Sequence, residues 1–303
     1  MNRLFAAVAI LACVSACGVS DVELEDDVLD EGSEGLSAYQ RSFVTARRDF
    51  RKCMFPMCGG WYVADVNRKT SREEYVKALD FGPSGLSEED VWKAEGAGQG
   101  ELLLRGKLGQ KGRDGFRTFI VSEAYRGMPG VQPVAGEEFY QANALGITCI
   151  TAPCFSETAS KLNSSSKTRF SSYSVARASR TLVDQEWLIN RIAHHDAIVA
   201  GTLTKGQNFP GGRDLVLDAS QVYLRLPEQA GPCPVMKLAA CPEGKAWSFE
   251  RNADRCALPV GCIEAGACAA YVPQCDDGYT LKSWTGGMFA CSAYACDPTF
   301  TVE

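Results

Sequence analysis

An internal repeat constrains the fold of this chain more than any other feature. Landmarks of residues 40–130 recur within residues 136–228, displaced by 95 or 96 positions. The recurring pairs are Cys53 with Cys149, Cys58 with Cys154, Asn67 with Asn163, Leu86 with Leu182, and Gly106 with Gly201. Landmarks that share one offset indicate two diverged copies of one domain. We call residues 40–130 the first copy and residues 136–228 the second copy.

Both copies show the same order of predicted elements. Hydrophobic alternation and turn residues predict strands at 42–50, 60–66, 74–81, 101–108 and 116–125 in the first copy. They predict strands at 168–178, 197–203 and 215–226 in the second copy. One helix per copy is expected, from Ser87 to Gly96 and over 183–194. Ser87 is the expected N-cap, with acidic residues following it in the first helical turn.

The element order predicts the fold class. Three strands, a helix and two strands follow one another as in an OB-type barrel. We therefore expect a mainly β (α+β) chain with two tandem, small, barrel-like domains of OB type. Each would carry one helix, and a small disulfide-rich C-terminal region would follow. A small α+β sheet with one covering helix is the alternative for each copy.

Residues 1–16 have the pattern of an export signal. A cation at Arg3 precedes the uncharged run Leu4–Val14, as in a signal peptide. The tetrapeptide Val14-Ser15-Ala16-Cys17 resembles the lipobox of bacterial lipoproteins, which implies cleavage before Cys17 and acylation of that cysteine, palmitate included. Gly18 after the cysteine resembles a signal for the outer membrane of the cell envelope. An ordinary secretory signal with a chance cysteine is the alternative.

Residues 17–39 are predicted to be an acidic, disordered tether. The segment has no basic residue and carries eight acids: Asp21, Glu23, Glu25, Asp26, Asp27, Asp30, Glu31 and Glu34. The whole chain has 31 basic and 37 acidic residues, so its negative charge is concentrated in this tether and the remaining body is nearly neutral. No basic patch indicates nucleic acid. The expected partners are a membrane, through the N-terminal lipid, and an envelope or extracellular protein.

The twelve cysteines beyond Cys13 and Cys17 favour six disulfides, since their number is even and the compartment is oxidising. Cys53–Cys58 and Cys149–Cys154 should each close the loop of a hairpin. Redox motifs usually space cysteines by two, and two cysteines cannot complete a tetrahedral metal site. Residues 231–303 hold two units of four cysteines. Pairing first with third and second with fourth gives Cys233–Cys256, Cys241–Cys262, Cys268–Cys291 and Cys275–Cys296, although four cysteines also permit two other pairings.

The sequence offers few groups for catalysis. The two histidines, His194 and His195, are adjacent at the end of a predicted helix. We expect them to cap the helix there, because neighbouring residues of a helix point in different directions and cannot easily bind one metal ion together. Nucleophile-elbow, zinc-protease, P-loop and dinucleotide-binding motifs are lacking. The glycine-rich segment 206–212 is expected to be a loop. We therefore expect a non-enzymatic protein with a binding or structural role, without cofactor or metal; an envelope hydrolase with an unrecognised site is one alternative.

Two resemblances bear on the body. The C-terminal units resemble small extracellular modules of the antistasin or knottin kind, which makes protease inhibition another alternative. Segments Arg48–Cys53, Cys58–Gly60, Val66–Asn67, Ile120–Tyr125 and Gly146–Cys154 resemble a domain of unknown function in exported bacterial lipoproteins. This resemblance covers residues 42–226 and implies a duplicated domain with a cysteine-rich C-terminus. Residues 68–75 lack a further cysteine pair of that family, and the resemblance supplies no activity.

Overall fold

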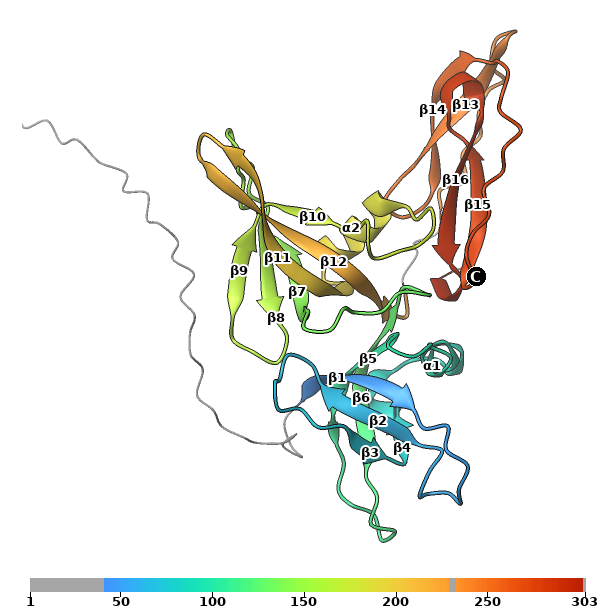
Figure 1. Ribbon diagram of the computed structural model, residues 1–303. Coiled ribbons are helices and arrows are strands. Elements are labelled where there is room, and N and C mark those ends of the chain that lie inside the picture. Colours follow the sequence, from blue (N-terminus) through green and yellow to red (C-terminus); the bar gives the residue numbers. More distant parts are fainter. Residues whose placement is uncertain (1–40, 229–232, 302–303) are drawn as a thin grey trace, which may run out of the picture. The chain divides into compact units, whose positions relative to one another are not determined.

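A computed structural model describes residues 41–228 and 233–301. The predicted signal peptide (1–16), the acidic tether (17–39) and the predicted lipidation site Cys17 lie outside these residues. The described chain is mainly β with two α-helices, which confirms the expected class (Figure 1). Neither helix is long and apolar enough to cross a membrane.

The same elements occur in the same order in both copies. The first copy contains β1 (Ser42–Arg48), β2 (Trp61–Asp65), β3 (Glu74–Val76), β4 (Ala78–Asp80), a 3₁₀ turn η1 (Gly82–Ser84), α1 (Glu88–Glu95), β5 (Leu102–Leu108) and β6 (Thr118–Gly127). The second contains β7 (Glu138–Ala144), β8 (Glu157–Lys161), β9 (Lys167–Phe170), β10 (Ser172–Ser174), α2 (Gln185–Ala193), β11 (Ala197–Phe209) and β12 (Gly212–Leu226). Ser87 caps α1 as predicted, accepting a hydrogen bond from the backbone N–H of Asp90 at 3.1 Å.

Three predicted segments differ from the structure. Segment 206–212 is not a loop, because β11 and β12 continue almost to its centre and only Pro210 and Gly211 form the turn. The single strands predicted at 74–81 and 168–178 are each two short strands. Lys77 separates the first pair, and its backbone N–H donates to the carbonyl oxygen of Arg117 at 2.9 Å. Strands β3 and β4 therefore bond to different neighbours.

The two copies form one continuous sheet rather than two closed barrels. The strand order is β3-β2-β1-β5-β6-β12-β11-β7-β8-β9, so the second half mirrors the first. The halves join where β6 pairs with β12 antiparallel, from Gly127 opposite Tyr223 to Ala124 opposite Leu226. Strands β4 and β10 add to β6 and β12 in parallel. OB-type barrels are thus not shown, and no sheet closes within the described residues.

A reciprocal exchange of asparagines also links the copies. Asn67 donates to the carbonyl oxygens of Phe139 and Leu162, at 2.8 and 2.9 Å, and accepts from the Phe139 N–H at 2.8 Å. Asn163 makes the same three bonds in the other direction, to Phe43 and Val66. A small core from both copies surrounds these contacts: Phe43, Val66, Leu103, Tyr125, Phe139, Leu162, Ile198, Ala200 and Tyr223.

The repeated glycine has a steric cause. A Cβ at Gly106 would lie 2.2 Å from the carbonyl oxygen of Ile120, and one at Gly201 would lie 2.3 Å from that of Asp218. Both glycines follow a register shift in the pairing of their strands. Only glycine fits at such close backbone approaches.

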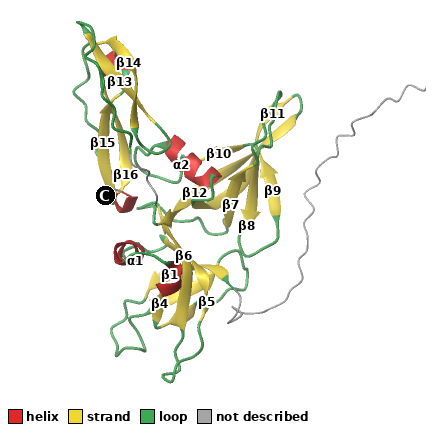
Figure 2. Ribbon diagram, turned by 180° about the vertical axis from the view of Figure 1, so that it is seen from behind, coloured by secondary structure: helices red, strands yellow, loops and turns green. Residues whose placement is uncertain are grey.

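The C-terminal region consists of two hairpins, β13 (Lys245–Arg251) with β14 (Ala257–Glu264) and β15 (Tyr279–Thr285) with β16 (Ser292–Pro298), followed by the 3₁₀ turn η3 (Thr299–Thr301) (Figure 2). A second 3₁₀ turn, η2 (Met288–Ala290), links β15 to β16. All twelve cysteines outside the N-terminal segment form disulfides, and in each C-terminal unit the first cysteine pairs with the third and the second with the fourth, the one expected among the three possible pairings. About 35 residues per hairpin unit is too few for an independent core, so the disulfides take over this role.

An arginine–carboxylate network ties this region to the second copy. Arg191 and Arg255 both pair with Glu228, at 3.0 and 2.8 Å, and Arg251 pairs with Asp297 at 2.5 Å. These five side chains are buried, and Arg255 also lies over the ring of Trp187 at 4.6 Å. Because charges lose their hydration on burial, each one here depends on its partners.

Candidate functional site

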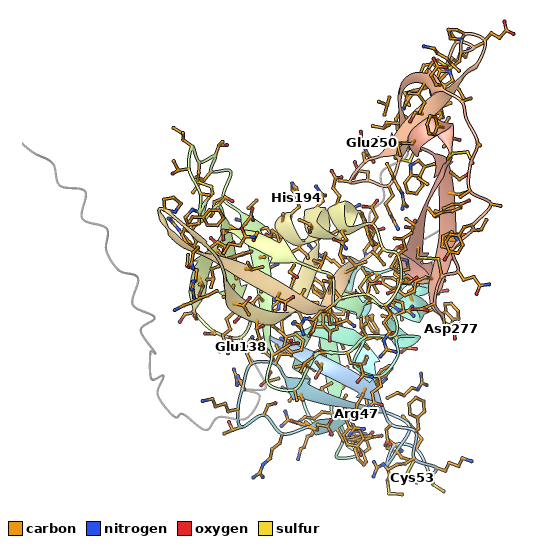
Figure 3. The ribbon with its side chains drawn as sticks, turned by 45° about the horizontal axis from the view of Figure 1, so that its top comes forward. Arg47, Cys53, Glu138, His194, Glu250 and Asp277 are labelled. Carbon is orange, nitrogen blue, oxygen red and sulfur yellow. A yellow bond between two sulfur atoms is a disulfide. The ribbon has the colours of Figure 1, made fainter. Side chains whose placement is uncertain are left out.

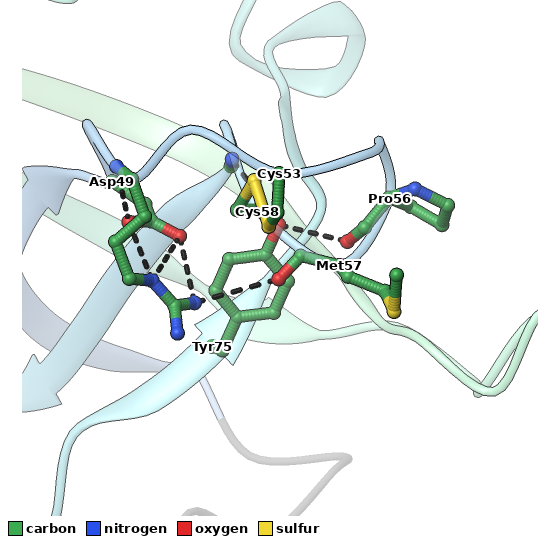
Figure 4. Close-up of a disulfide and its surroundings, with 8 residues drawn as sticks. Asp49, Cys53, Pro56, Met57, Cys58 and Tyr75 are labelled. Carbon is green, nitrogen blue, oxygen red and sulfur yellow. Dashed lines mark hydrogen bonds and ion pairs between the residues drawn. A yellow bond between two sulfur atoms is a disulfide. The ribbon is translucent and has the colours of Figure 1, made fainter.

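The loop between β1 and β2, residues 49–60, is built as a rigid projection that we call the first stapled loop. Its base closes where the N–H of Asp49 donates to the carbonyl oxygen of Gly60 at 2.9 Å. The Cys53–Cys58 disulfide holds two Cα atoms 5.7 Å apart, and a hydrogen bond from Met57 N–H to the Met54 carbonyl closes a turn between them. Figure 4 shows the disulfide above its supporting residues.

Tyr75 of β3 supports the loop from below. Its hydroxyl donates to the carbonyl oxygen of Pro56 at 2.9 Å and accepts from the N–H of Gly60 at 3.2 Å (Figure 4). A Cβ at Gly60 would lie 2.2 Å from the Val76 carbonyl oxygen, so only glycine lets the loop approach β3 this closely. The Tyr75 ring also packs edge-on against Tyr62 and Phe116, with centroids 5.5 and 5.8 Å apart.

An internal ion pair fixes the first residues of the loop. The buried carboxylate of Asp49 accepts from the backbone N–H of Arg51 and from its guanidinium, at 2.8 to 3.1 Å. This side-chain hydrogen bond from Arg51 lowers the pKa of Asp49 below its ordinary value. The Asp49 and Arg51 charges therefore compensate each other and stabilise the loop.

The loop presents apolar side chains to solvent, with Phe50 next to its base and Met54, Phe55 and Met57 in the turn closed by the disulfide. Phe50 is 84% exposed, Met54 78%, Phe55 64% and Met57 58%. A disulfide-closed loop has lost much of its conformational entropy before any partner binds. Large exposed apolar side chains on a rigid projection are typical of an interaction surface.

Cations outnumber acids in the segments at this end of the first copy. Residues 47–60 contain four cations and one acid, and residues 109–117, the loop between β5 and β6, contain three cations and one acid. Both loops extend from the same end of the first copy, where Figure 3 also places Arg47 and Cys53. Arg48, Lys52, Lys111 and Arg113 are exposed and form no ion pair with any described residue. We call these four cations and the exposed apolar side chains Phe50, Met54, Phe55 and Met57 the stapled-loop surface.

The second copy repeats the apolar part of this surface without the charge. Its stapled loop, residues 145–156, is closed by Cys149–Cys154 and by a hydrogen bond from the Leu145 N–H to the Ser156 carbonyl. Ile150 is fully exposed and Ile147 is 44% exposed. This segment contains no charged residue, which makes it an internal comparison for the first stapled loop.

The histidines do not form a site with other groups. His194 is the C-cap of α2, and its Nδ1 lies 2.9 Å from the Asn190 carbonyl oxygen, in keeping with the predicted capping role. His195 has a left-handed backbone conformation, with φ of 65°. Within residues 41–228 and 233–301, no three histidine, cysteine or acidic side chains are placed to hold a metal ion.

One polar cavity bears on the hydrolase alternative. It measures about 290 Å³ and lies where β6, α2 and the end of β12 meet, with Glu123, Asp196 and Glu228 in its lining. Glu228 already forms ion pairs with Arg191 and Arg255. Burial tends to raise the pKa of Glu123, but hydrogen bonds from Tyr125 and Arg105 outweigh it and hold that pKa below its ordinary value. A general acid or base working near neutral pH needs the opposite shift.

The sequence predicted the two cysteine hairpins but assigned them only a structural role. The signal for a surface was present, since three of the four residues between Cys53 and Cys58 are large and apolar and Lys52 precedes them. Reading it required knowing that neither Met54 nor Phe55 folds back against the sheet.

Comparison with known proteins identifies relatives without naming an activity. A family model described as a domain of unknown function (DUF6748) matches residues 42–229. A protein of Dictyostelium discoideum described as uncharacterized is 26% identical over 258 residues, which cover 82% of this chain and 84% of the relative. No solved structure matches the chain significantly.

Proposed function

We propose that this chain, which belongs to the family of the domain of unknown function DUF6748, is a lipid-anchored, non-enzymatic protein with a binding role at the cell envelope. The lipobox-like segment ending at Cys17 and the glycine after it support an anchor in the outer membrane. The observation that carries the binding role is the group of exposed apolar side chains on the first stapled loop. The body provides a rigid support for that loop.

We further propose that each copy is an OB-type fold opened within one strand. Pairing in the order β3-β2-β1-β5-β6, with β4 added parallel to β6, supports this connectivity if β3 and β4 are one strand bent at Lys77. In OB-folds the loops joining the first two and the last two strands commonly bind ligands. Here those loops are the first stapled loop and the β5–β6 loop, which together carry the stapled-loop surface.

Two experiments test the proposal separately. Replacing Cys17 with serine should abolish incorporation of labelled palmitate and release the protein from the membrane fraction of a bacterial host. A photo-crosslinking residue at position 55, in cells that naturally make the protein, should give adducts that the same residue at the exposed position Asp277 does not. Absence of palmitate on the unchanged protein would exclude the anchor, and absence of both protein and lipid adducts at position 55 would exclude the binding role.

Protease inhibition is a second candidate, favoured by a different loop. Between β15 and β16, Met288 and Phe289 are 82% and 55% exposed; backbone hydrogen bonds from Gly286 and Gly287 to Cys291 close the turn, and the Cys268–Cys291 disulfide ties its end to the chain before β15. Such a convex, stapled loop can enter a protease cleft. The C-terminal hairpins contribute Tyr279 and Phe300 to the main core, so the test requires the whole body. Lack of inhibition of serine and cysteine proteases by that body would exclude this candidate.

A further inference from the structure

We infer that the stapled-loop surface binds the surface of an anionic lipid bilayer, with Phe50, Met54 and Phe55 entering the interface. The inference deepens the proposed function, because it names the partner of the same surface. It requires no lipid on Cys17, so its test is independent of the anchor.

The first argument is the chemistry of the tip. Transfer of phenylalanine and methionine side chains from water to the boundary between headgroups and acyl chains is favourable. The three side chains are 64% to 84% exposed. They protrude from a loop whose backbone is held by a disulfide, by the Asp49–Arg51 pair and by Tyr75. Insertion therefore requires little reorganisation of the protein.

The second argument is charge complementarity. Residues 47–60 and 109–117, which are the two loops and the end of β1, hold seven cations and two acids. Both acids are already paired within the protein, Asp49 with Arg51 and Asp114 with Lys77. The charges left for a partner are the cations Arg48, Lys52, Lys111 and Arg113. Cations around an apolar tip match a layer of anionic headgroups over an apolar interior.

The third argument is geometry. The 24 residues between Cys17 and Ser42 can span at most about 90 Å, so an anchored body stays near the bilayer. Tethering raises the effective concentration of the loop at the membrane. A weak affinity of the loop would then suffice to orient the body, while the lipid would retain it.

The test is sedimentation of vesicles with oxidised residues 34–303, one compact unit that contains every described element and all six disulfides. We expect binding to phosphatidylcholine vesicles that contain phosphatidylglycerol, weakening at high salt, and little binding to phosphatidylcholine alone. The variant F50S/M54S/F55S should bind at least tenfold more weakly. Because these side chains are exposed, the fold should not change, and circular dichroism checks this.

Two further variants separate the contributions. I147S/I150S, the matched change in the uncharged second stapled loop, should bind anionic vesicles like the unchanged body. K52Q/K111Q/R113Q should lose about fivefold per charge on anionic vesicles. Failure of the unchanged body to bind, or binding that is insensitive to the F50S/M54S/F55S change, would overturn the inference. Protein adducts at position 55 without vesicle binding would also overturn it, while leaving the proposed binding role in place.

Discussion

Replacing Asn67 with alanine should lower the free energy of unfolding by about 4 kcal/mol. The side chain makes three hydrogen bonds to the backbone of the second copy, and each contributes about 1 kcal/mol net. The backbone at Asn67 is left-handed, with φ of 61°, which costs alanine a further ~1 kcal/mol or more. A total near 4 kcal/mol is a large part of the stability of an ordinary domain.

Urea unfolding of residues 34–303, followed by tryptophan fluorescence, measures this loss. Asn67→Gly isolates the hydrogen bonds, because glycine tolerates the left-handed backbone, and should lose about 1 kcal/mol less than the alanine variant. Asn163→Ala is an internal replicate, since its three bonds and its φ of 56° are equivalent. A loss below about 1 kcal/mol at either asparagine, or a glycine variant less stable than the alanine variant, would refute the reasoning.

Three further predictions concern other parts of the body. Gly106→Ala should cost about 1–3 kcal/mol in urea unfolding, because the new Cβ would lie 2.2 Å from a carbonyl oxygen. Asp297→Ala should cost about 3–5 kcal/mol, because it leaves Arg251 buried beside Arg255 with only the more distant carboxylate of Asp184, at 3.8 Å, and hydrogen exchange should localise the loosening to the C-terminal hairpins. Burial raises the pKa of Tyr279 to about 12, so its contribution to stability should be complete below pH 10 and decrease as pH rises towards 12; Tyr279→Phe should reduce the alkaline loss of stability without abolishing it, because burial also raises the pKa of Tyr125, Tyr140, Tyr173 and Tyr223.

Matched changes control these three predictions. Gly201→Ala should reproduce the loss at Gly106, since its Cβ meets a carbonyl oxygen at 2.3 Å. Asp277→Ala, at an exposed carboxylate of the same region, should leave stability unchanged. Tyr271 is 73% exposed, so Tyr271→Phe should leave the alkaline loss intact. Equal effects at Asp277 and Asp297 would show that burial of the network is not the cause.

Local chemistry was predictable from the sequence where one short segment contains all the determinants. Cysteine spacing gave the hairpin disulfides, and Ser87 with its following acids gave the start of α1. The repeat itself was visible because Asn67 and Gly106 each serve a backbone geometry that other residues fit poorly. Such residues persist while the side chains around them change.

The long-range structure was not predictable by the same reasoning. The pairing of β6 with β12 uses backbone hydrogen bonds, and no periodic residue pattern distinguishes it from closure of each copy on itself. The network around Arg251 and Asp297 joins residues 46 positions apart. In the sequence, neither residue can be told from a charged residue that is exposed to solvent. The stapled-loop surface exists because apolar side chains of the loop remain exposed instead of packing against the sheet. The spacing of the residues does not predict that exposure.

Duplication explains why the two copies could acquire different roles. Their shared core and exchanged asparagines are nearly symmetric, so each copy stabilises the other. The differences lie on the outer surfaces. Helix α2 buries Trp187 beneath Arg255 of the C-terminal hairpins, whereas α1 leaves Trp92 76% exposed. The second copy thus packs against the C-terminal hairpins, and its stapled loop has no charged residue. The first copy carries the exposed cations, and its loop is therefore the one that we propose to bind an anionic surface.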